Sequence, residues 1–291
     1  MELTAEPILQ ANALLGEGAI WDHDRQVLHW VDINNYRIHT FDPRTNSNTW
    51  VEVGEHVGTV VKRSKAKGGG FVVGLPRKFA HVDAGGKVSV MAELKETEAN
   101  RSNDGKCDPS GRFWCGSMTF DFTPGASNLY MLDTDHRLHH KLDKVTTSNG
   151  LVWTKDGKTM YYIDTGNNQL DVFDFDIATG DIKNRRVAVS NKWGGYFDGM
   201  TIDSDDNVYI AIWGGGKVLK INPRTGDLLG TIKVPGAKNV TSCTFGGADF
   251  HDLYITTSGE EADREKEPNA GALFKVRLED AQGMPAYEFL G

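Results

Sequence analysis

The 291-residue sequence has no apolar run near the roughly 18 residues that a membrane-spanning helix needs, so we expect no membrane partner. It has only three cysteines, and none of them stands in a CxxC pair or another zinc spacing. Its formal charge is -8, and no Lys/Arg cluster is interleaved with aromatic residues, so we expect no nucleic acid partner. No long segment has a helical 3.6-residue period. These absences leave a soluble protein that binds small molecules or cations.

The first ten residues, MELTAEPILQ, lack the basic start and the uninterrupted apolar stretch of a secretory signal. We therefore expect a cytoplasmic protein with free thiols. Cys107 and Cys115 flank one strand pair and could form a disulfide in principle, but buried unpaired cysteine is the commoner case.

Glycine is abundant, with 33 residues, and the sequence repeats itself. The clear copies start roughly 43 to 50 residues apart, and a fainter copy from Lys67 fills the one double-length gap. Within a copy we find a short apolar strand, a turn, a strand rich in β-branched and aromatic residues, a second turn and an alternating strand. The clear copies begin at Gly18, Lys106, Gly150, Gly199 and Ser242. The pattern predicts about four strands per unit and six units.

Four-stranded units of this length predict an all-β fold, a six-bladed β-propeller. Each blade buries its faces against its neighbours, and a closed ring leaves few strand edges exposed. A β-helix would need a much shorter period. No Pro/Ser-rich linker interrupts the chain, so we predict one domain over residues 1–291. From this architecture we expect the leading strand, around Thr4 to Leu9, to complete the last blade.

The residues just before each inner strand indicate where a site would lie. They are GEG (16–18), RSNDGK (101–106), SNGL (148–151) and FDGM (197–200), at the same place in four repeats. Because the inner strands of a propeller begin at one rim of the channel, four side chains should point from different blades toward one axial point. They are Glu17, Asn103, Asn149 and Asp198. Loops between second and third strands reach the same rim and add Asp121 and the acidic segment SGEEADREKEPNAG near residue 258.

Asn-Gly and Asp-Gly pairs are also ordinary turn residues, because Asn, Asp and Gly tolerate positive φ, and this alternative stays open. Against it, the other two blades carry HVGTV near Gly58 and NVTSC near Thr241, so the fold does not require an acid or amide there. Two carboxylates and an amide oxygen on one axis would repel one another unless a cation lay between them. Such an all-oxygen set suits Ca²⁺, Mg²⁺ or Mn²⁺ and is compatible with Zn²⁺ or Fe²⁺.

These segments resemble the SMP-30/gluconolactonase/luciferin-regenerating enzyme family of regucalcin-like sugar lactonases, and the match runs nearly end to end. It is carried by LLGEGAIWD with LHWVDI, NRSNDGKCDPSGRFWCGSM, SNGLVWTKDGKTMYYIDTG, YFDGMTID and TSCTFGGADFHDLYITTS. The resemblance implies a six-bladed propeller with one catalytic divalent cation at the channel mouth. It implies these metal ligands and substrate contacts: Glu17, Asn149 and Asp198 for the metal, Arg101 and Asn103 for the substrate. Some animal members carry Glu where this chain has Asp121, in the substrate-facing loop, and this difference bears on which sugar is bound.

The implied geometry predicts metal-dependent hydrolysis of a sugar lactone to the aldonic acid, with a metal-associated water attacking the carbonyl carbon. Asp198 is the candidate general base, and Arg101 and Asn103 would hold sugar hydroxyls or polarise the carbonyl. Each substrate contact has a plainer alternative. Arg101 could form a rim salt bridge, Asn103 could cap a turn, and Asp121 could be a solvated loop acid.

Two other functions stay open on the same residues. A propeller with this rim could bind calcium and regulate without catalysis, since a fold does not fix a function. It could also act as an esterase or phosphotriesterase on the same metal site. In that case four aromatic residues would form an apolar wall, unless they only pack: Trp193, Tyr196, Phe120 and Phe122.

Overall fold

The fourth repeat shows how the sequence pattern becomes a sheet. The computed structural model describes residues 2–291 and places β15 (Ser148–Trp153) antiparallel to β16 (Thr159–Asp164). Gly157 lies in the turn between them with φ 65°, a left-handed conformation that glycine adopts without strain. Two further strands, β17 (Gln169–Asp176) and β18 (Asp181–Ser190), extend the sheet outward. The repeat therefore forms one antiparallel sheet of four strands.

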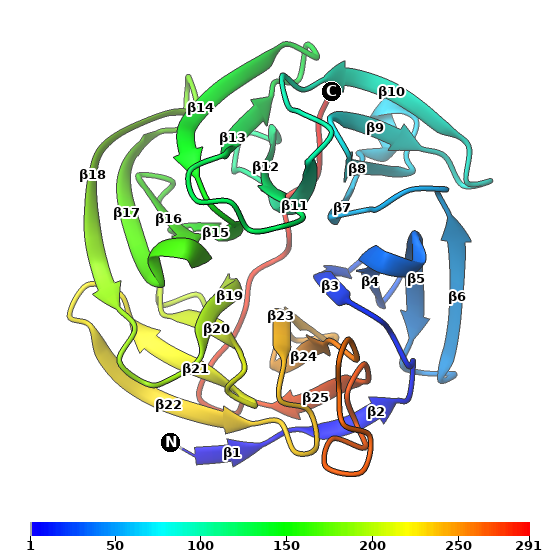
Figure 1. Ribbon diagram of the computed structural model, residues 1–291, viewed down its shortest axis with the longest axis vertical. Coiled ribbons are helices and arrows are strands. Elements are labelled where there is room, and N and C mark those ends of the chain that lie inside the picture. The colour runs from blue at the N-terminus through cyan, green and yellow to red at the C-terminus, as the bar shows by residue number, and fades with distance from the viewer. Residues whose placement is uncertain (1) are drawn as a thin grey trace.

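Six such sheets, the blades of a β-propeller, surround a central channel, as the sequence predicts (Figure 1). We number the blades by their inner strands, which are β3 (Gly16–Asp22), β7 (Thr59–Lys62), β11 (Asn100–Cys107), β15, β19 (Tyr196–Ile202) and β23 (Val240–Gly246). The second strands are β4 (Val27–Asp32), β8 (Phe71–Leu75), β12 (Phe113–Thr119), β16, β20 (Val208–Trp213) and β24 (Asp252–Thr257). The third strands are β5 (Arg37–Asp42), β9 (Lys78–Val82), β13 (Ser127–Leu132), β17, β21 (Lys217–Asn222) and β25 (Leu273–Arg277). The outer strands are β6 (Ser47–Glu52), β10 (Val88–Glu93), β14 (Leu138–Val145), β18, β22 (Asp227–Lys233) and β2 (Glu6–Leu9). Short 3-10 turns are η1 (Ile33–Asn35), η2 (Lys65–Lys67) and η3 (Thr165–Asn167).

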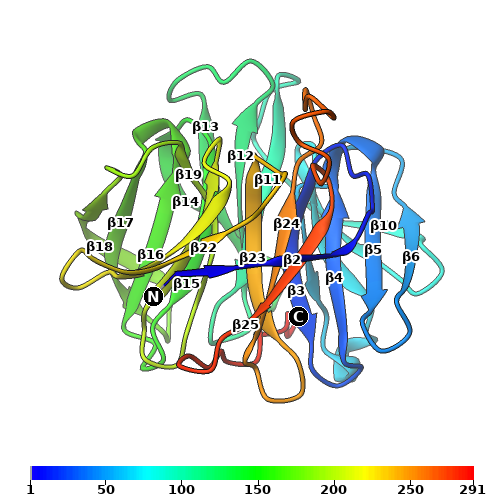
Figure 2. The same cartoon turned by 90° about the horizontal axis from the view of Figure 1, so that it is seen from below.

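An N-terminal strand closes the ring. β2 pairs antiparallel with β25 and supplies the outer strand of blade 6, which confirms the predicted closure for residues 6–9. Thr4 belongs instead to β1 (Glu2–Thr4), which pairs parallel with β22 of blade 5 as a fifth strand. One short segment therefore connects the last two blades (Figure 2).

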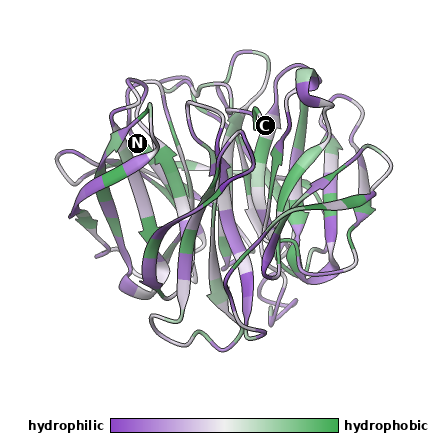
Figure 3. Cartoon of the chain, turned by 90° about the horizontal axis from the view of Figure 1, so that it is seen from above, coloured by the Kyte–Doolittle hydropathy of each residue, from purple (hydrophilic) through white to green (hydrophobic). Residues whose placement is uncertain are grey.

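The hydrophobic core lies between the blades. Every residue of β3, β12 and β23 is buried, whereas the outer strands β6 and β18 are largely exposed. Hydrophobic colour is common along the strands, and hydrophilic colour is common in the loops at the two rims (Figure 3). Burial of apolar surface, worth about 25 cal/mol per Å², is the main stabilising contribution to such a fold. Polar residues on the buried inner strands therefore need a reason to be there.

The inner strands are not regular where their side chains meet the channel. Five of the six carry a register shift against the second strand, close to the rim at which they begin, which we call the upper rim. The shifts fall between Glu17 and Ile20, Ser102 and Gly105, Ser148 and Leu151, Phe197 and Met200, and Val240 and Ser242. Such β-bulges add a residue to one strand and re-aim its side chains.

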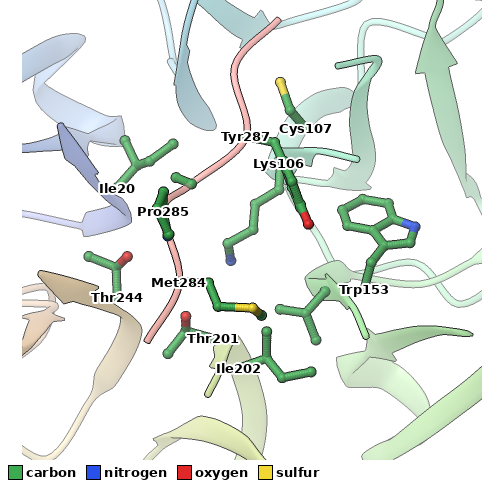
Figure 4. Close-up of a pocket in the computed structure, with 12 residues that line it drawn as sticks. Ile20, Lys106, Cys107, Trp153, Thr201, Ile202, Thr244, Met284, Pro285 and Tyr287 are labelled. Atoms are coloured by element: carbon green, nitrogen blue, oxygen red, sulfur yellow. The ribbon is translucent and has the colours of Figure 1, made fainter. Parts of the chain in front are cut away.

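The C-terminal segment, residues 278–291, crosses the opposite, lower rim (Figures 1 and 2). Its backbone amides and carbonyls bond to blades 6, 5, 2 and 3, at His251, Ser204, Lys62 and Gly111. A cavity of about 70 Å³ lies between this segment and the inner strands. Lys106 reaches into it from β11, opposite Met284, Pro285 and Tyr287 of the segment (Figure 4).

The structure bears on two expectations from composition. Within residues 2–291, no helix is long and apolar enough to cross a bilayer. Cys107, Cys115 and Cys243 are all buried and free, as expected. Burial raises the pKa of each thiol, so these cysteines are poor nucleophiles.

Candidate functional site

The bulges gather polar side chains at the upper rim. Asn149 and Asp198 lie within the bulges of β15 and β19, and Asn103 and Asp104 share the bulge of β11. Glu17 is the last paired residue before the bulge of β3. All five side chains are nearly inaccessible, with 5% or less of their surface exposed. Residues from four blades therefore meet in one buried polar group.

Glycine follows the candidate ligands because neighbouring inner strands approach closely at the bulges. A Cβ added at Gly150 would stand 2.7 Å from Met200 Cγ and 2.9 Å from the backbone oxygen of Asp198. Distances under 3.0 Å do not occur for real Cβ atoms, so a side chain here would push β15 away from β19. Asn149 and Gly150 lie inside β15, and the alternative that this pair forms a turn is therefore wrong.

Three carboxylates share this small volume. Burial raises the pKa of Glu17, and the negative charge of Asp104 raises it further. Burial, followed by the charges of Glu17 and Asp104, raises the pKa of Asp198 well above its ordinary value. The hydrogen bond from the Gly18 amide and the positive charges of Arg101 and Lys106 act in the opposite direction on the pKa of Glu17 and only partly offset these effects. Without more positive charge, the three groups cannot all be ionised together.

Three buried oxygens of the group have no hydrogen-bond partner among residues 2–291: Asp104 Oδ2, Asn149 Oδ1 and Asp198 Oδ1. Such atoms are rare in folded proteins, because each costs about 1–3 kcal/mol. The amide of Asn149 is held by its Nδ2, which donates to Thr165 Oγ1 at 2.9 Å, and Thr165 donates in turn to Phe197 O at 2.7 Å. The carbonyl oxygen of Asn149 is thereby left without a donor beside Asp198.

The chemistry of this donor set fits a hard divalent cation. Carboxylate and amide oxygens are the ligands of such ions, and a cation would pair the orphaned oxygens and permit ionisation of the acids. In the part of the chain that the structure describes, no three or more His, Cys, Asp or Glu side chains are arranged to hold a metal by themselves. A cation at the upper rim would therefore need an amide oxygen in its coordination, as Asn149 offers.

Arg101 and Asn103 are coupled to each other and to the neighbouring blade. Arg101 Nη1 donates to Asn103 Oδ1 at 2.7 Å and to Ser102 O at 3.0 Å, and Asn103 Nδ2 donates to Ser148 O at 2.8 Å. Burial lowers the pKa of Arg101 to about 10, while the negative charges of Glu17, Glu260 and Asp198 act in the opposite direction.

These contacts decide between the plainer alternatives for the two residues. Arg101 is 7% exposed and donates to a carbonyl and an amide oxygen, which differs from an exposed rim salt bridge. Asn103 lies in the bulge of β11 and not in a turn, so the turn-cap alternative is wrong.

Asp121 lies apart from this group. It is exposed in the loop between β12 and β13, and its Oδ1 accepts hydrogen bonds from the amide and hydroxyl of Thr123 at 3.2 and 2.8 Å. The hydrogen bonds of Thr123, followed by that of Thr119, lower the pKa of Asp121. The neighbouring residue Phe120 donates its amide to Ala99 O, which puts the loop at the upper rim as predicted. In this arrangement Asp121 matches the solvated loop acid.

The four predicted aromatic residues do not form one wall. Phe120 instead ends a row with His56 and Tyr36, whose ring centroids are separated by 5.1 and 4.9 Å. Burial, followed by the charge of Arg101, lowers the pKa of His56. Trp193 stacks on Phe197 and packs against the core of blades 4 and 5. The remaining two, Phe122 and Tyr196, are 61% and 54% exposed.

Inspection of the sequence does not select two residues of this region, Asp104 and His56. Asp104 directly follows Asn103, and only the bulge brings both neighbours into the buried group. The sequence signal that could have selected Asp104 is its position in the RSNDGK segment, directly before Gly105. His56 lies in the loop before β7, in one of the two blades that carry no acid or amide at the inner strand, so the repeat pattern gives no reason to select it.

Comparison with known proteins identifies the family. A family model described as "SMP-30/Gluconolactonase/LRE-like region" matches residues 15–259, which is most of the chain. The chain belongs to this family. Regucalcin of Danio rerio is 37% identical to this SMP-30/gluconolactonase family member over 296 residues, covering 99% of both chains. "Putative sugar lactone lactonase YvrE" of Bacillus subtilis (strain 168) is 36% identical over 288 residues, covering 96% and 97% of the two chains.

The architecture agrees with that of a solved relative. A luciferin-regenerating enzyme superimposes with a TM-score of 0.91 at 30% identity, over 98% of both chains. The overall fold of this family member is therefore shared with a solved enzyme.

Proposed function

We propose that this protein hydrolyses a sugar lactone to the aldonic acid in a metal-dependent reaction at the upper rim. The observation that carries the proposal is the set of orphaned oxygens of Asp104, Asn149 and Asp198, buried in a protein of the gluconolactonase family. The choice of a lactone is supported by the relative from Bacillus subtilis, which is named "Putative sugar lactone lactonase YvrE".

Glu17, Asn149 and Asp198 would hold one divalent metal ion, and the all-oxygen set suits Ca²⁺, Mg²⁺ or Mn²⁺ and is compatible with Zn²⁺ or Fe²⁺. When bound, the ion would supply Lewis acidity for the lactone carbonyl and lower the pKa of a water molecule. Asp104, which is buried beside Glu17, would add a negative charge that favours a dication over a monovalent ion.

Asp198 would act as the general base. Its carboxylate takes a proton from the attacking water as the new bond to the carbonyl carbon forms. The bond between that carbon and the ring oxygen then breaks, and the same carboxyl group returns the proton to the ring oxygen. The product acid loses its own proton at neutral pH, so each turnover releases one proton to the solvent.

Arg101 and Asn103 would orient the sugar. The hydrogen bonds of Arg101 to Asn103 Oδ1 and Ser102 O fix its guanidinium with further N–H groups left to donate to hydroxyls or to the carbonyl. A buried guanidinium among carboxylates remains charged at neutral pH, because even its lowered pKa is about 10. Asp121 would contact only a substrate that extends to the β12–β13 loop.

The experiment is proton release, followed with a pH indicator, from a panel of aldonolactones and one phosphotriester. Protein stripped with a chelator is assayed alone and with each divalent metal added back. We expect release from at least one lactone that depends on metal. Metal binding without turnover of any ester would indicate a calcium-binding protein, and preference for the phosphotriester would indicate a phosphotriesterase.

Three substitutions test the residues. We expect Asn149→Ala and Glu17→Gln to lose activity with the fold intact, and Asp198→Ala to lower kcat by about 10²–10⁴, the usual contribution of a general base. Asp135→Asn, in an exposed turn, is the control and should retain activity. Retained hydrolysis in all three variants would overturn the assignment.

A further inference from the structure

A second hollow lies on the upper rim between blades 5 and 6. Its volume is about 430 Å³, within the range of small-molecule sites. Six of the residues that line it carry the argument: Tyr196, Trp213, Lys238, Asn239, Glu260 and Glu267. None of them belongs to the group of Glu17, Asn149 and Asp198.

One wall of the hollow is aromatic. Tyr196 and Trp213 are opposite partners in the β19–β20 ladder, so their side chains lie on the same face of the blade as neighbours. The Tyr196 ring is 54% exposed, which leaves it free to be covered by a ligand. Trp213 is half-buried and packs against a core cluster that includes Leu15.

The aromatic wall is rigidly held. Gly195 O accepts hydrogen bonds from Asn191 Nδ2 at 2.9 Å and from Asn168 Nδ2 at 3.1 Å. Asn168 Oδ1 accepts from the amide of Phe197 at 2.9 Å, so both backbone neighbours of Tyr196 are fixed. An exposed ring on a fixed backbone loses little entropy when a ligand covers it.

The opposite wall is polar. Asn239 Oδ1 accepts from the Gly214 amide at 3.1 Å, which orients its NH₂ group as a donor. Glu260 accepts from Asn34 Nδ2 through one carboxylate oxygen, at 3.1 Å, and its other oxygen remains an acceptor. Glu267 accepts from the Lys238 amide at 2.8 Å. The lining carries three carboxylates, those of Glu260, Glu261 and Glu267, and one ammonium, that of Lys238. This excess of negative charge disfavours the binding of phosphate and other anions.

The hollow adjoins the candidate site. The charge of Glu260 acts on the pKa of the buried Arg101 guanidinium, and the amide of Glu260 donates to Leu14 O, three residues before Glu17. Tyr196 stands two residues before Asp198 on β19. A molecule bound at the buried carboxylates could therefore extend between blades 5 and 6.

We propose that this hollow binds a second, neutral sugar ring, so that the substrate is the lactone of a disaccharide. A hexose ring has an apolar C–H face, which covers an aromatic ring, and a hydroxyl edge, which bonds to carboxylate and amide groups. Water adds across the lactone ester and the glycosidic bond stays intact, so the product is an aldobionic acid. This inference rests on the proposed lactonase activity and names its substrate class.

The test compares kcat/KM for glucono-1,5-lactone with kcat/KM for the 1,5-lactones of maltobionic, cellobionic and lactobionic acids. We expect at least one disaccharide lactone to be favoured by about ten-fold, the value of one good aromatic contact. Tyr196→Ala should lower the ratio of disaccharide to monosaccharide kcat/KM by a similar factor, mainly through KM. Trp50→Ala removes an equally exposed ring from β6, outside the hollow, and should leave the ratio unchanged.

Two outcomes separate this proposal from the lactonase assignment. If glucono-1,5-lactone is hydrolysed but no disaccharide lactone is favoured, the lactonase stands and the sugar subsite is wrong. If nothing is hydrolysed, calorimetric binding of maltobionate, cellobionate and lactobionate against gluconate decides. Tighter binding of an aldobionate that Tyr196→Ala abolishes would support the hollow as a sugar site, and equal binding would overturn it.

Discussion

Glu17 is costly to the metal-free protein because it is buried beside Asp104 and Asp198. Burial raises the pKa values of all three acids, and the charge of Asp104 adds to this for Glu17 and Asp198, so in the absence of a cation folding favours protonated forms. The same arrangement is what would give a dication its binding energy. We therefore propose that Glu17 favours cation binding and lowers the stability of the metal-free protein.

Glu17→Gln should separate the two effects. The neutral amide removes one of three repelling acids, so we expect the chelator-treated variant to melt a few degrees above the chelator-treated parent, as a relief of about 1 kcal/mol would give. Added Ca²⁺ should stabilise the variant less than it stabilises the parent. Melting curves with and without metal measure both quantities.

Glu52→Gln is the control for that measurement, since Glu52 forms an exposed ion pair with Arg37. It should alter neither the metal-free melting temperature nor the metal-induced shift by much. A lower metal-free melting temperature for Glu17→Gln would show that the carboxylate of Glu17 stabilises the protein without a cation.

At the scale of the element, the bulges do what a regular strand could not. In a regular strand, alternate residues point to one face of the sheet. In each of the bulges of β11, β15 and β19, two successive residues of the inner strand stand opposite one residue of the second strand. The glycines that follow allow the inner strands to approach one another closely enough for residues of different blades to share one buried volume.

Gly150→Ala tests this close approach. The added Cβ meets Met200 Cγ and the Asp198 backbone at under 3.0 Å, so we expect about 1–3 kcal/mol of destabilisation, the usual cost of overpacking. Because β19 carries Asp198, metal affinity should fall as well. Urea unfolding and metal titration measure the two effects.

Gly85→Ala is the matched control. Gly85 lies in an exposed turn, and the one atom within 4 Å of an added Cβ is the flexible Asp83 Oδ1, at 3.3 Å. This variant should keep both stability and metal affinity. Unchanged metal affinity in Gly150→Ala would indicate that β15 and β19 can separate without moving Asp198.

The strands, the six blades and the rim of the site were predictable, because period-two patterns and turn residues are local properties of the sequence. Blade 2 was faint because its inner strand β7 has only four residues, TVVK. The bulges were not predictable, since an extra residue within a buried strand leaves no turn signature. Asp104 was missed for that reason, and the pairing of β1 with β22 depends on contacts between residues more than 220 positions apart, such as Glu2 and Thr231.

For the whole molecule, acid stability should depend strongly on blade 1. His39 is stacked on Trp30 with centroids 4.0 Å apart, and its Nδ1 lies 3.0 Å from Asn48 Nδ2, which suits a neutral ring. Burial lowers the pKa of His39 from 6.5 to about 4; Arg37 acts in the same direction and Asp32 opposes it. Burial also lowers the pKa of His29 in the same blade.

At His39 the unfolded chain binds more protons than the folded one between about pH 4 and 6.5, so the contribution of this residue to stability rises with pH across this window. The raised pKa values of Glu17, Asp104 and Asp198 contribute with the opposite sign in the metal-free protein, so the effect of His39 has to be measured against a variant that lacks it. We expect the urea midpoint of the parent, relative to that of His39→Gln, to rise as the pH increases from about 4 to 6.5. His23→Gln, at an exposed position, should give no such pH-dependent difference from the parent. A difference between the parent and His39→Gln that is constant between pH 4.5 and 7 would contradict the expectation.

The pairing of β2 with β25 also bears on the order of biosynthesis. β2 leaves the ribosome before any blade exists, and its partner is the last strand of the chain to be made. Until β25 is made, the backbone donors and acceptors of β2 lack this partner strand. An unpaired strand edge can pair with other chains and so promotes aggregation. Blades 1 to 4 can form during synthesis, but the ring closes only after β25 has emerged from the ribosome.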